Sequence, residues 1–461
     1  MIENSESFTQ FRLQLYQHFN KRADTLIDLV DAISSNSQAR SVVELSINTC
    51  FRRDYTSLFK AVADYEPKEA KGNLAQLAAP YLPQPQERSF FLLGVDVTPQ
   101  SRPYAFKLAE RECVYQPTPV QSNKPITFGH QYSSVFALPE RTGQQSPHWV
   151  IPLNTKRVKR DNKEEMGAIQ IRELLEDKGL PFHNQLCVEA VDSGYSKPAY
   201  LSANRDKSNL VTITRARSNR IFYRQPEKTE STIGRGHPNW YGAKFSLRDP
   251  DTWPTPDETV TTTFISRRGK VYRVEIEAWY DMLTRGKCKK AQLPMQNYPF
   301  TLVRVSQYNK EGESVYTNPM WLIVMGEERR KLSLLDIYKS YKQRYDIEHF
   351  FRFGKQRMLL DHYQTPETHH EEKWWNLVHL AYLQLWVAKQ YAVSLPRPWE
   401  RYLPMMREEP PSPAMVQRNF ERIIRQFGTL SSIPKRRGNS SGRQKGMTQA
   451  LRQDKPIVRT G

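Results

Sequence analysis

The sequence predicts an α/β protein whose core is a mixed β-sheet interrupted by a β-rich insertion. Between residues 89 and 217, short apolar runs typical of buried strands alternate with helical segments. Residues 218–318 are rich in Arg, Pro, Gly, Trp and Thr and contain strand-like stretches of their own. A tract of about a hundred residues is better explained as an inserted subdomain than as a loop. From residue 319 onward, helical periodicity dominates.

Length, charge and cysteine usage narrow the class of protein. A chain of 461 residues is expected to form two to four domains. Its net charge of +19 favours a polyanionic partner, nucleic acid before membrane, over a merely basic soluble protein. The sequence has neither a membrane-spanning run nor a secretory signal. We expect a cytoplasmic protein with reduced thiols, because no zinc or redox spacing joins its cysteines, Cys50, Cys113, Cys187 and Cys288.

Residues 1–88 are predicted to be mostly helical. Apolar residues recur at helical spacing in FTQFRLQLYQHFNKRADTLIDLVDAIS and again in SVVELSINTCFRRDYTSLFKAVADY. Arg52, Arg53 and Lys60 lie on or near the second stretch. A small DNA-end-binding domain and a helical dimerisation or packing element are equally compatible with this pattern. The proline-rich PYLPQPQE, residues 80–87, marks the boundary to the next region.

The first part of the core begins with FFLLGVDVTP, residues 90–99, a continuous apolar run that carries Asp96. Strand-like segments follow and suit an antiparallel meander, and an amphipathic helix then ends at Gly179. A further apolar strand ends on Asp192, before a short helix and a last strand at 209–217. The order of strands, helix, strand, short helix and strand indicates an α/β fold with a mixed sheet.

The second part of the core contains one long predicted helix, SLLDIYKSYKQRYDIEHFFRFGKQRMLL, at 333–360. MWLIVMG, at 320–326, precedes it as either a core strand or an edge of the insertion. The apolar EEKWWNLVHLAYLQLWVAKQYA, at 371–392, is expected to pack against this helix. We interpret the polar cluster at its start as a solvated helix start rather than a metal site: His369, His370, Glu371 and Glu372.

The C-terminal region is predicted to be a flexible basic tail that contacts phosphates without reading bases, although a solubilising role is the alternative. The predicted division of the chain is 1–88, helical region with possible DNA-end binding; 89–217, first part of the core; 218–318, β-rich insertion; 319–408, second part of the core; 409–461, basic tail.

One face of the helix at 333–360 is unusual for a core helix. Residues at three- and four-residue steps fall near one face, and here they are Ile337, Tyr341, Arg344, Glu348, Phe351 and Lys355. A glutamate that points into a folded interior is costly unless it is paired. A divalent metal ion is one suitable partner for Glu348, and Arg344 or Lys355 is another.

Glu348 joins Asp96 and Asp192 as three carboxylates on three core elements far apart in sequence. Taken singly, these residues have ordinary explanations: a turn former, a helix cap, and an ion pair of Glu348 with Arg344 or Arg352. Together they match a ribonuclease H-like core, which holds two divalent ions with such a set. Magnesium suits carboxylate ligands. Two ions about 3.5–4 Å apart support in-line phosphoryl displacement.

The chain resembles bacterial DDE insertion-sequence transposases of the cut-and-paste group. Tyr341, Arg344, Glu348 and Lys355 match the Y-x2-R-x3-E-x6-K signature of that family. GVDVTP and AVDSGYS look like its two aspartate motifs, and the tract before Glu348 lies where the family carries its β-rich insertion. The resemblance covers roughly residues 90–395.

This resemblance implies an enzyme that binds terminal inverted repeats, cleaves DNA, often through a hairpin, and joins the 3′ ends to target DNA. Its metal ligands are Asp96, Asp192 and Glu348, which hold two Mg²⁺ ions that Mn²⁺ can replace. It also implies a homodimer on double-stranded DNA, near the nucleoid. The expected DNA contacts are Tyr341, Arg344, Lys355, Arg215, Arg217, Arg220 and Trp321. Trp321 is the candidate for stacking on a flipped base, with Trp240 and Trp253 as alternatives, although core packing is the favoured role for any single one of these tryptophans.

Two other functions stay open at this stage. A ribonuclease H-like nuclease such as a resolvase would use the same carboxylates to cleave without joining. A transposase-derived DNA-binding protein would have lost catalysis, which the intact set of three carboxylates disfavours.

Overall fold

The structure, a computed structural model, describes residues 5–68, 72–115, 125–141, 143, 146–226, 239–266, 269–288, 293–394 and 410–434. It confirms the predicted fold class, a ribonuclease H-like mixed sheet with a β-rich insertion and a helical N-terminal region. Ten strands of the described residues form one sheet, which runs in the order β2-β3-β1-β5-β6-β14-β13-β10-β9, with β4 paired to β3.

The half of the sheet that carries Asp96 and is followed by Asp192 has the strand order β4-β3-β1-β5-β6. Its first three strands form an antiparallel meander, while β5 and β6 run parallel to β1. The helical crossover through α5 allows β5 to run parallel to β1. The short strand β2 adds an edge beside the outer end of β3. The bounds are β1 (Phe91–Ser101), β2 (Glu112–Tyr115), β3 (Ile126–Ala137), β4 (Ile151–Val158), α5 (Lys163–Glu176), β5 (Cys187–Val191), α6 (Pro198–Leu201) and β6 (Leu210–Arg215).

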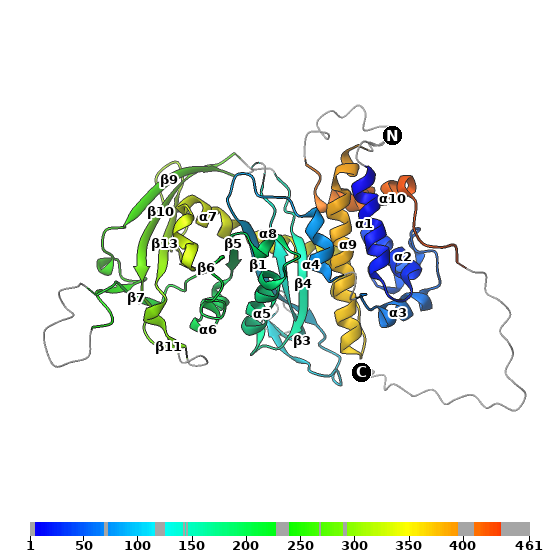
Figure 1. The fold of residues 1–461 in the computed structure, drawn as a ribbon, viewed down its shortest axis with the longest axis horizontal. Helices are drawn as coiled ribbons and strands as arrows, with labels where there is room; N and C mark the ends of the chain where they lie inside the picture. The colour runs from blue at the N-terminus through cyan, green and yellow to red at the C-terminus, as the bar shows by residue number, and fades with distance from the viewer. Residues whose placement is uncertain are drawn as a thin grey trace, which may run out of the picture.

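The insertion continues the core sheet. Strand β14 pairs with β6 on one side and with β13 on the other, so 320–326 is both a core strand and an insertion edge. Strands β9, β10 and β13 form the end of the sheet that is farthest from the N-terminal helices in Figure 1. The bounds are β7 (Ile221–Tyr223), β8 (Lys244–Ser246), β9 (Glu258–Ile265), β10 (Val271–Met282), β11 (Lys287–Cys288), β12 (Leu293–Pro294), β13 (Phe300–Tyr308) and β14 (Met320–Met325).

The prediction of one helix across 333–360 is wrong. The segment forms two consecutive helices, α7 (Leu334–Gln343) and α8 (Tyr345–Arg357), which meet at Arg344. The Ile347 N–H bonds the Arg344 carbonyl at 3.0 Å, a three-residue step that is tighter than an α-helical turn. Ile347 lies against β1 at Gly94, where a Cβ atom would come within 2.4 Å of its Cδ1. This close approach seats α8 directly on the central strand.

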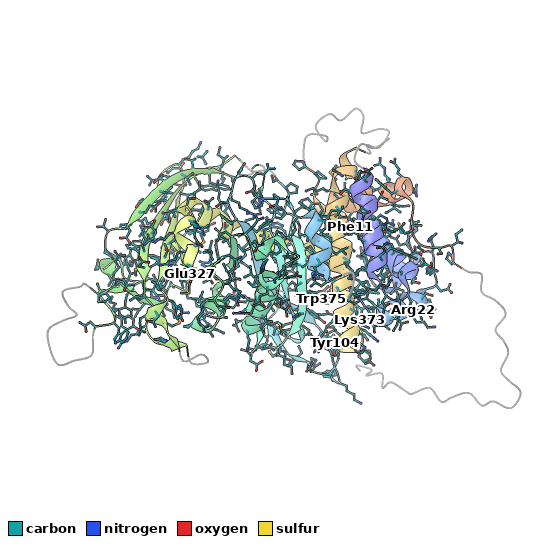
Figure 2. The ribbon with its side chains drawn as sticks, viewed as in Figure 1. Phe11, Arg22, Tyr104, Glu327, Lys373 and Trp375 are labelled. Carbon is teal, nitrogen blue, oxygen red and sulfur yellow. The ribbon has the colours of Figure 1, made fainter. Side chains whose placement is uncertain are left out.

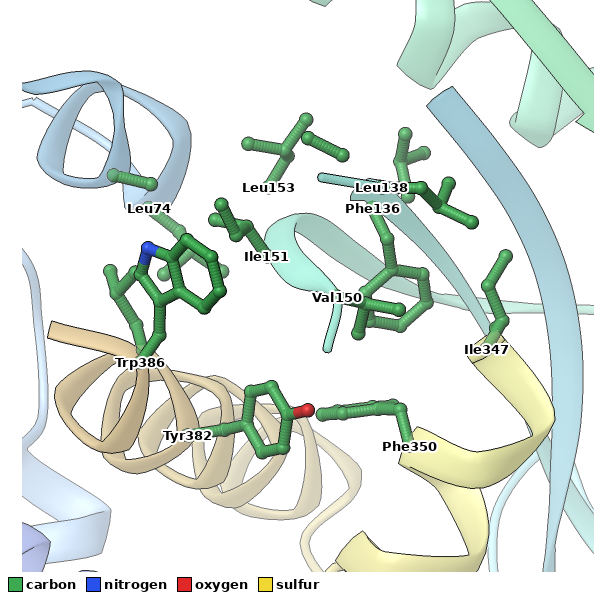
Figure 3. Close-up of a cluster of buried hydrophobic side chains, with 14 of the residues drawn as sticks. Leu74, Phe136, Leu138, Val150, Ile151, Leu153, Ile347, Phe350, Tyr382 and Trp386 are labelled. Atoms are coloured by element: carbon green, nitrogen blue, oxygen red, sulfur yellow. The ribbon is translucent and has the colours of Figure 1, made fainter. Parts of the chain in front are cut away.

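The long helix α9 (Thr368–Ser394) stands between the sheet and the other helices (Figure 1). Trp375, labelled in Figure 2, reaches toward the sheet and stacks on Tyr132 of β3 with ring centroids 4.0 Å apart. Figure 3 shows Phe350 of α8 and Tyr382 of α9 converging on apolar side chains of β3 and β4. The remaining helices are α1 (Ser5–His18), α2 (Ala23–Ser34), α3 (Tyr55–Asp64), α4 (Leu74–Ala78) and α10 (Pro413–Phe427).

The N-terminal helices share one continuous apolar core with α9 and the sheet. Arg52 and Arg53 of this region bond Ser431, and both lie within ion-pair distance of Asp28. Lys60 is exposed. These contacts show the region in a packing role, and they leave DNA-end binding an untested prediction.

The C-terminal region is partly ordered, in contrast to the expected flexible tail from residue 409. Helix α10 begins at Pro413 with Ser412 as its N-cap and packs against α9 and α2. Its strongly amphipathic pattern explains the difference, since Val416, Phe420 and Ile423 recur on one buried face. The predicted phosphate-contacting tail from residue 435 lies outside the described residues. In the part of the chain described here, no helix is both long and apolar enough to cross a membrane.

A buried ion pair joins α1, α2 and α9. Both terminal nitrogens of Arg12 bond Asp31, at 2.5 and 2.8 Å, and both side chains are almost completely buried. Gln384 of α9 accepts a bond from Arg12 and donates one to Asp31. The remaining polar atoms of the pair are thus satisfied, which makes a buried charge pair tolerable.

We expect Asp31→Ala to lower the free energy of unfolding by about 3–5 kcal/mol, because it leaves a buried, uncompensated guanidinium. The matched control is Asp64→Ala, which removes an exposed pair with Arg22 and should cost less than about 1 kcal/mol. Urea denaturation followed by circular dichroism measures both. Equal losses in the two variants would contradict the role assigned to the buried pair.

Candidate active site

Strand register places Asp96 and Asp192 side by side. Gly94 of β1 pairs with Ala190 of the parallel strand β5, and each aspartate lies two residues farther along its chain. Asp192 ends β5 and caps the short 3-10 helix Ser193–Tyr195, accepting the Gly194 N–H at 2.8 Å. The Asp192 carboxylate can cap this helix and also bind a second partner, since one carboxylate has several acceptor positions.

Glu348 approaches this pair from α8, and Arg344 connects it to Asp96. One terminal nitrogen of Arg344 donates to Asp96 at 3.2 Å, and the other donates to Glu348 at 3.1 Å. The ion pair of Glu348 with Arg344, considered above as an ordinary explanation, is therefore present. The exposed fractions of the side chains are 15% for Arg344, 19% for Asp96 and 41% for Glu348, so the site opens to solvent on the Glu348 side.

The electrostatics of Asp96 reflect all three acids. Burial raises the pKa of its carboxyl, Arg344 opposes this shift, and Asp192 and Glu348 reinforce it, so that the pKa reaches about 6. Arg344 interacts electrostatically with the same three carboxylates. The three acids thus form one coupled group around a single guanidinium.

The donor set fits a hard divalent ion in its chemistry, because carboxylate oxygens are the ligands that Mg²⁺ prefers. No group of three or more His, Cys, Asp or Glu side chains within the described ranges is gathered closely enough for a metal site. The guanidinium of Arg344 instead supplies the positive charge at Asp96 and Glu348. Arg344 thus occupies one oxygen of Asp96 and one oxygen of Glu348.

The other residues of the predicted signature lie at two places around this group. Tyr341 is close to Arg344, and burial raises the pKa of its hydroxyl while Arg344 and Arg215 oppose that shift. Lys355 is near the end of α8 and lies beside the later part of β1, where its Nζ donates to the Pro99 carbonyl at 2.6 Å. Arg344 at the acids and Lys355 beside the end of β1 are called the basic strip below, and Arg215 lies near Tyr341.

The three arginines predicted to bind DNA differ in their surroundings. Arg215 and Arg217 are exposed at and beyond the end of β6. Arg220 donates to the Ser196 carbonyl at 2.9 Å and is half-buried. Arg220 therefore also holds the loop that follows Asp192.

The prediction that Trp321 stacks on a DNA base needs correction. Its side chain is only 2% exposed and packs among Phe245, Trp253 and Trp279 in the second apolar core of the protein. A base cannot reach a ring that is enclosed on all sides. Trp240, one of the two alternatives, has 45% of its surface exposed.

Sequence reasoning missed Asp346, which is fully buried at the start of α8. It accepts bonds from Arg141 and lies 2.5 Å from the His148 Nδ1. These contacts fix the start of α8, and with it Arg344 and Glu348. The available signal was an acid four residues before Phe350, on the apolar side of the helix.

Glu371, expected at a solvated helix start, is also fully buried. It bonds Arg102, His130 and Tyr132 at 2.8–2.9 Å, so it anchors α9 to the ends of β1 and β3. The sequence pattern failed because the three partners are far from Glu371 in the chain.

Residues 14–286, more than half of the chain, match a family model described as DDE superfamily endonuclease. The matched stretch includes Asp96 and Asp192 and ends before α7 and α8. No curated protein matches the chain.

A fourth acid, Glu189, lies on β5 three residues before Asp192, and it makes the stability of the protein depend on pH in a way that can be tested. It is buried on β5, bonded by Thr212 and Tyr200, and burial raises its pKa from 4.5 to about 7. Stability therefore falls as the pH rises from about 4.5 through 7, because the folded state binds the proton more tightly. Relative to the natural protein, Glu189→Gln should gain about 2–3 kcal/mol between pH 5 and pH 8. Urea denaturation at both pH values checks this, and a pH-independent difference would contradict it.

Proposed function

Because the chain belongs to the DDE superfamily of endonucleases, we propose that it is a DNA transposase. It binds the ends of a mobile element, cleaves the DNA and joins the 3′ ends to target DNA. The observation that carries this proposal is the convergence of Asp96, Asp192 and Glu348 from β1, β5 and α8 around one guanidinium.

In this proposal, Asp96, Asp192 and Glu348 hold two Mg²⁺ ions, which Mn²⁺ can replace. When bound, such ions activate the attacking oxygen and stabilise the leaving oxygen of an in-line displacement. The side chains supply the ligands and a rigid frame: Asp192 is fixed by its cap bond and Glu348 by the seat of α8 on β1.

The DNA path follows the basic strip. Tyr341, Arg344 and Lys355 contact phosphates at the cut end, as expected for the Y-R-E-K signature of bacterial insertion sequences. Arg can bind a phosphate through two nitrogens, Lys provides a point charge, and Tyr provides a hydroxyl donor. Arg215 and Arg217 extend the strip, and Trp240 replaces Trp321 as the exposed ring for any flipped base. A homodimer on DNA belongs to the same proposal.

A nuclease or resolvase on the same fold is the first alternative. It would cleave DNA with the same acids but would not join a pre-cut 3′ end to a second duplex. A catalytically silent DNA-binding protein is the second alternative, which the preserved set of acids disfavours.

We expect Asp96→Ala, Asp192→Ala and Glu348→Ala each to eliminate cleavage and strand transfer while DNA binding persists, because the acids act in chemistry. The assay follows joining of a pre-cut terminal repeat to a plasmid in Mg²⁺ or Mn²⁺, and removal of the metal with EDTA should stop it. Glu189→Gln is the matched control: it changes a buried acid three residues before Asp192 and should keep both activities.

Two results would decide against the transposase. Cleavage without any joining by the natural protein would identify a nuclease or resolvase. If Asp192→Ala left the biological activity unchanged, the proposal that the protein acts as an enzyme would be wrong.

A substitution of Arg217 tests the proposed DNA contacts independently of the three acids. We expect Arg217→Gln to weaken binding of duplex DNA and to reduce the slope of log affinity against log salt concentration by about one, the loss of one phosphate contact. The control is Arg172→Gln on α5. Neighbouring residues of a strand point to opposite faces of the sheet, and Gly94 of β1 lies against α8 while Val95 lies against α5. Helix α5, and with it Arg172, is therefore on the face of the sheet opposite to α8. Fluorescence anisotropy across a salt series measures both, and equal slopes in the two variants would contradict this path.

A further inference from the structure

Arg344 occupies the position between two of the three acids that the proposed metal ions would need. Its two terminal nitrogens bond Asp96 at 3.2 Å and Glu348 at 3.1 Å, and it also interacts with Asp192. The Arg344 side chain is 15% exposed. Its positive charge offsets the charge of carboxylates that would hold the proposed divalent ions.

The guanidinium can exchange its partners without losing hydrogen bonds. A planar guanidinium binds a phosphate with the same two-nitrogen geometry that it uses for carboxylates. Arg344 also sits at the junction where α7 ends and α8 begins, next to Tyr341. A DNA phosphate beside Tyr341 would therefore compete with Asp96 and Glu348 for the same side chain.

We propose that Arg344 is an internal competitor of the metal ions that couples metal binding to DNA binding. Without DNA, its guanidinium holds Asp96 and Glu348 and keeps the affinity of the site for divalent ions low. DNA phosphate withdraws the guanidinium and frees both acids for the ions. This inference rests on the proposed metal site and DNA substrate, and it adds an order to their binding.

The coupling must act in both directions. If DNA raises the affinity for metal, metal raises the affinity for DNA by the same factor, and couplings of this kind are typically about 5–150-fold. An enzyme built in this way binds its ions more tightly on DNA than in the free protein.

The first experiment measures Mn²⁺ binding to the full chain without DNA by calorimetry. We expect Arg344→Gln to bind Mn²⁺ at least about fivefold more tightly than the natural protein. The matched control is Arg352→Gln, which removes an exposed positive charge one turn beyond Glu348 on the same helix. In the described part of the chain, the ion pair of Glu348 is with Arg344 rather than Arg352. Arg352→Gln should therefore change Mn²⁺ affinity much less.

A second measurement uses the natural protein, so it does not depend on the folding of a variant. Mn²⁺ affinity is compared with and without a duplex carrying the terminal repeat. We expect the duplex to raise it at least about fivefold in the natural protein and to have little effect in Arg344→Gln. Arg344→Lys, which keeps the charge but cannot bridge two carboxylates, should lie between them. Thermal unfolding confirms that each variant is folded.

The outcomes separate this inference from the proposed function. Equal Mn²⁺ affinity in the natural protein with and without DNA, together with no gain in Arg344→Gln, would overturn the inference and leave the metal site intact. A gain of the same size in Arg352→Gln would also overturn it, because general charge would then explain the effect. Mn²⁺ binding that survives Asp192→Ala, or that is absent even with DNA, would overturn the metal site itself.

Discussion

The repulsion among three acids at the meeting point of β1, β5 and α8 is the constraint on which the site depends. Strand register places Asp96 beside Asp192, and the seat of Ile347 on Gly94 brings α8 and Glu348 to them. Burial is the largest cause of the raised pKa of Asp96, Arg344 opposes it, and the neighbouring acids Asp192 and Glu348 add to it. In the protein alone the cation is Arg344. In the proposed complex, metal ions and phosphate divide that role.

The rest of the fold keeps this costly arrangement in place. Asp346 ties the start of α8 to Arg141 and His148, and Glu371 ties α9 to the outer ends of β1 and β3. Both acids are fully buried and paired, so each link has one favourable geometry. Helix α8 is thus held from two directions, while its exposed side, with Glu348 at 41%, faces solvent.

The core fold could be predicted because it depends on local pattern. The same patterns select Asp96, Asp192 and Glu348, whose roles stay predictions. Asp96 and Asp192 end apolar runs, and parallel strands bring such positions to one level. The rest depends on contacts across the chain. The break at Arg344 follows from the fit of α8 on Gly94, the burial of Trp321 from three distant aromatic rings, and the sheet-extending insertion from strand pairing of β14 with β6. None of these contacts leaves a local pattern in the sequence.

The spacing of Arg344 and Glu348 explains why a metal ligand and an ordinary helix pair could not be distinguished in the sequence. Four residues place the two side chains on one face, which is the geometry of a common surface ion pair. Asp96 makes the difference, because it offers the same guanidinium a second carboxylate. The two terminal nitrogens that hold Asp96 and Glu348 are the ones that a guanidinium uses for two-nitrogen binding of a phosphate, so the three ligands would compete for them. In the proposed exchange, the two interpretations of Glu348 are successive states of one side chain, with Arg344 as the partner that leaves.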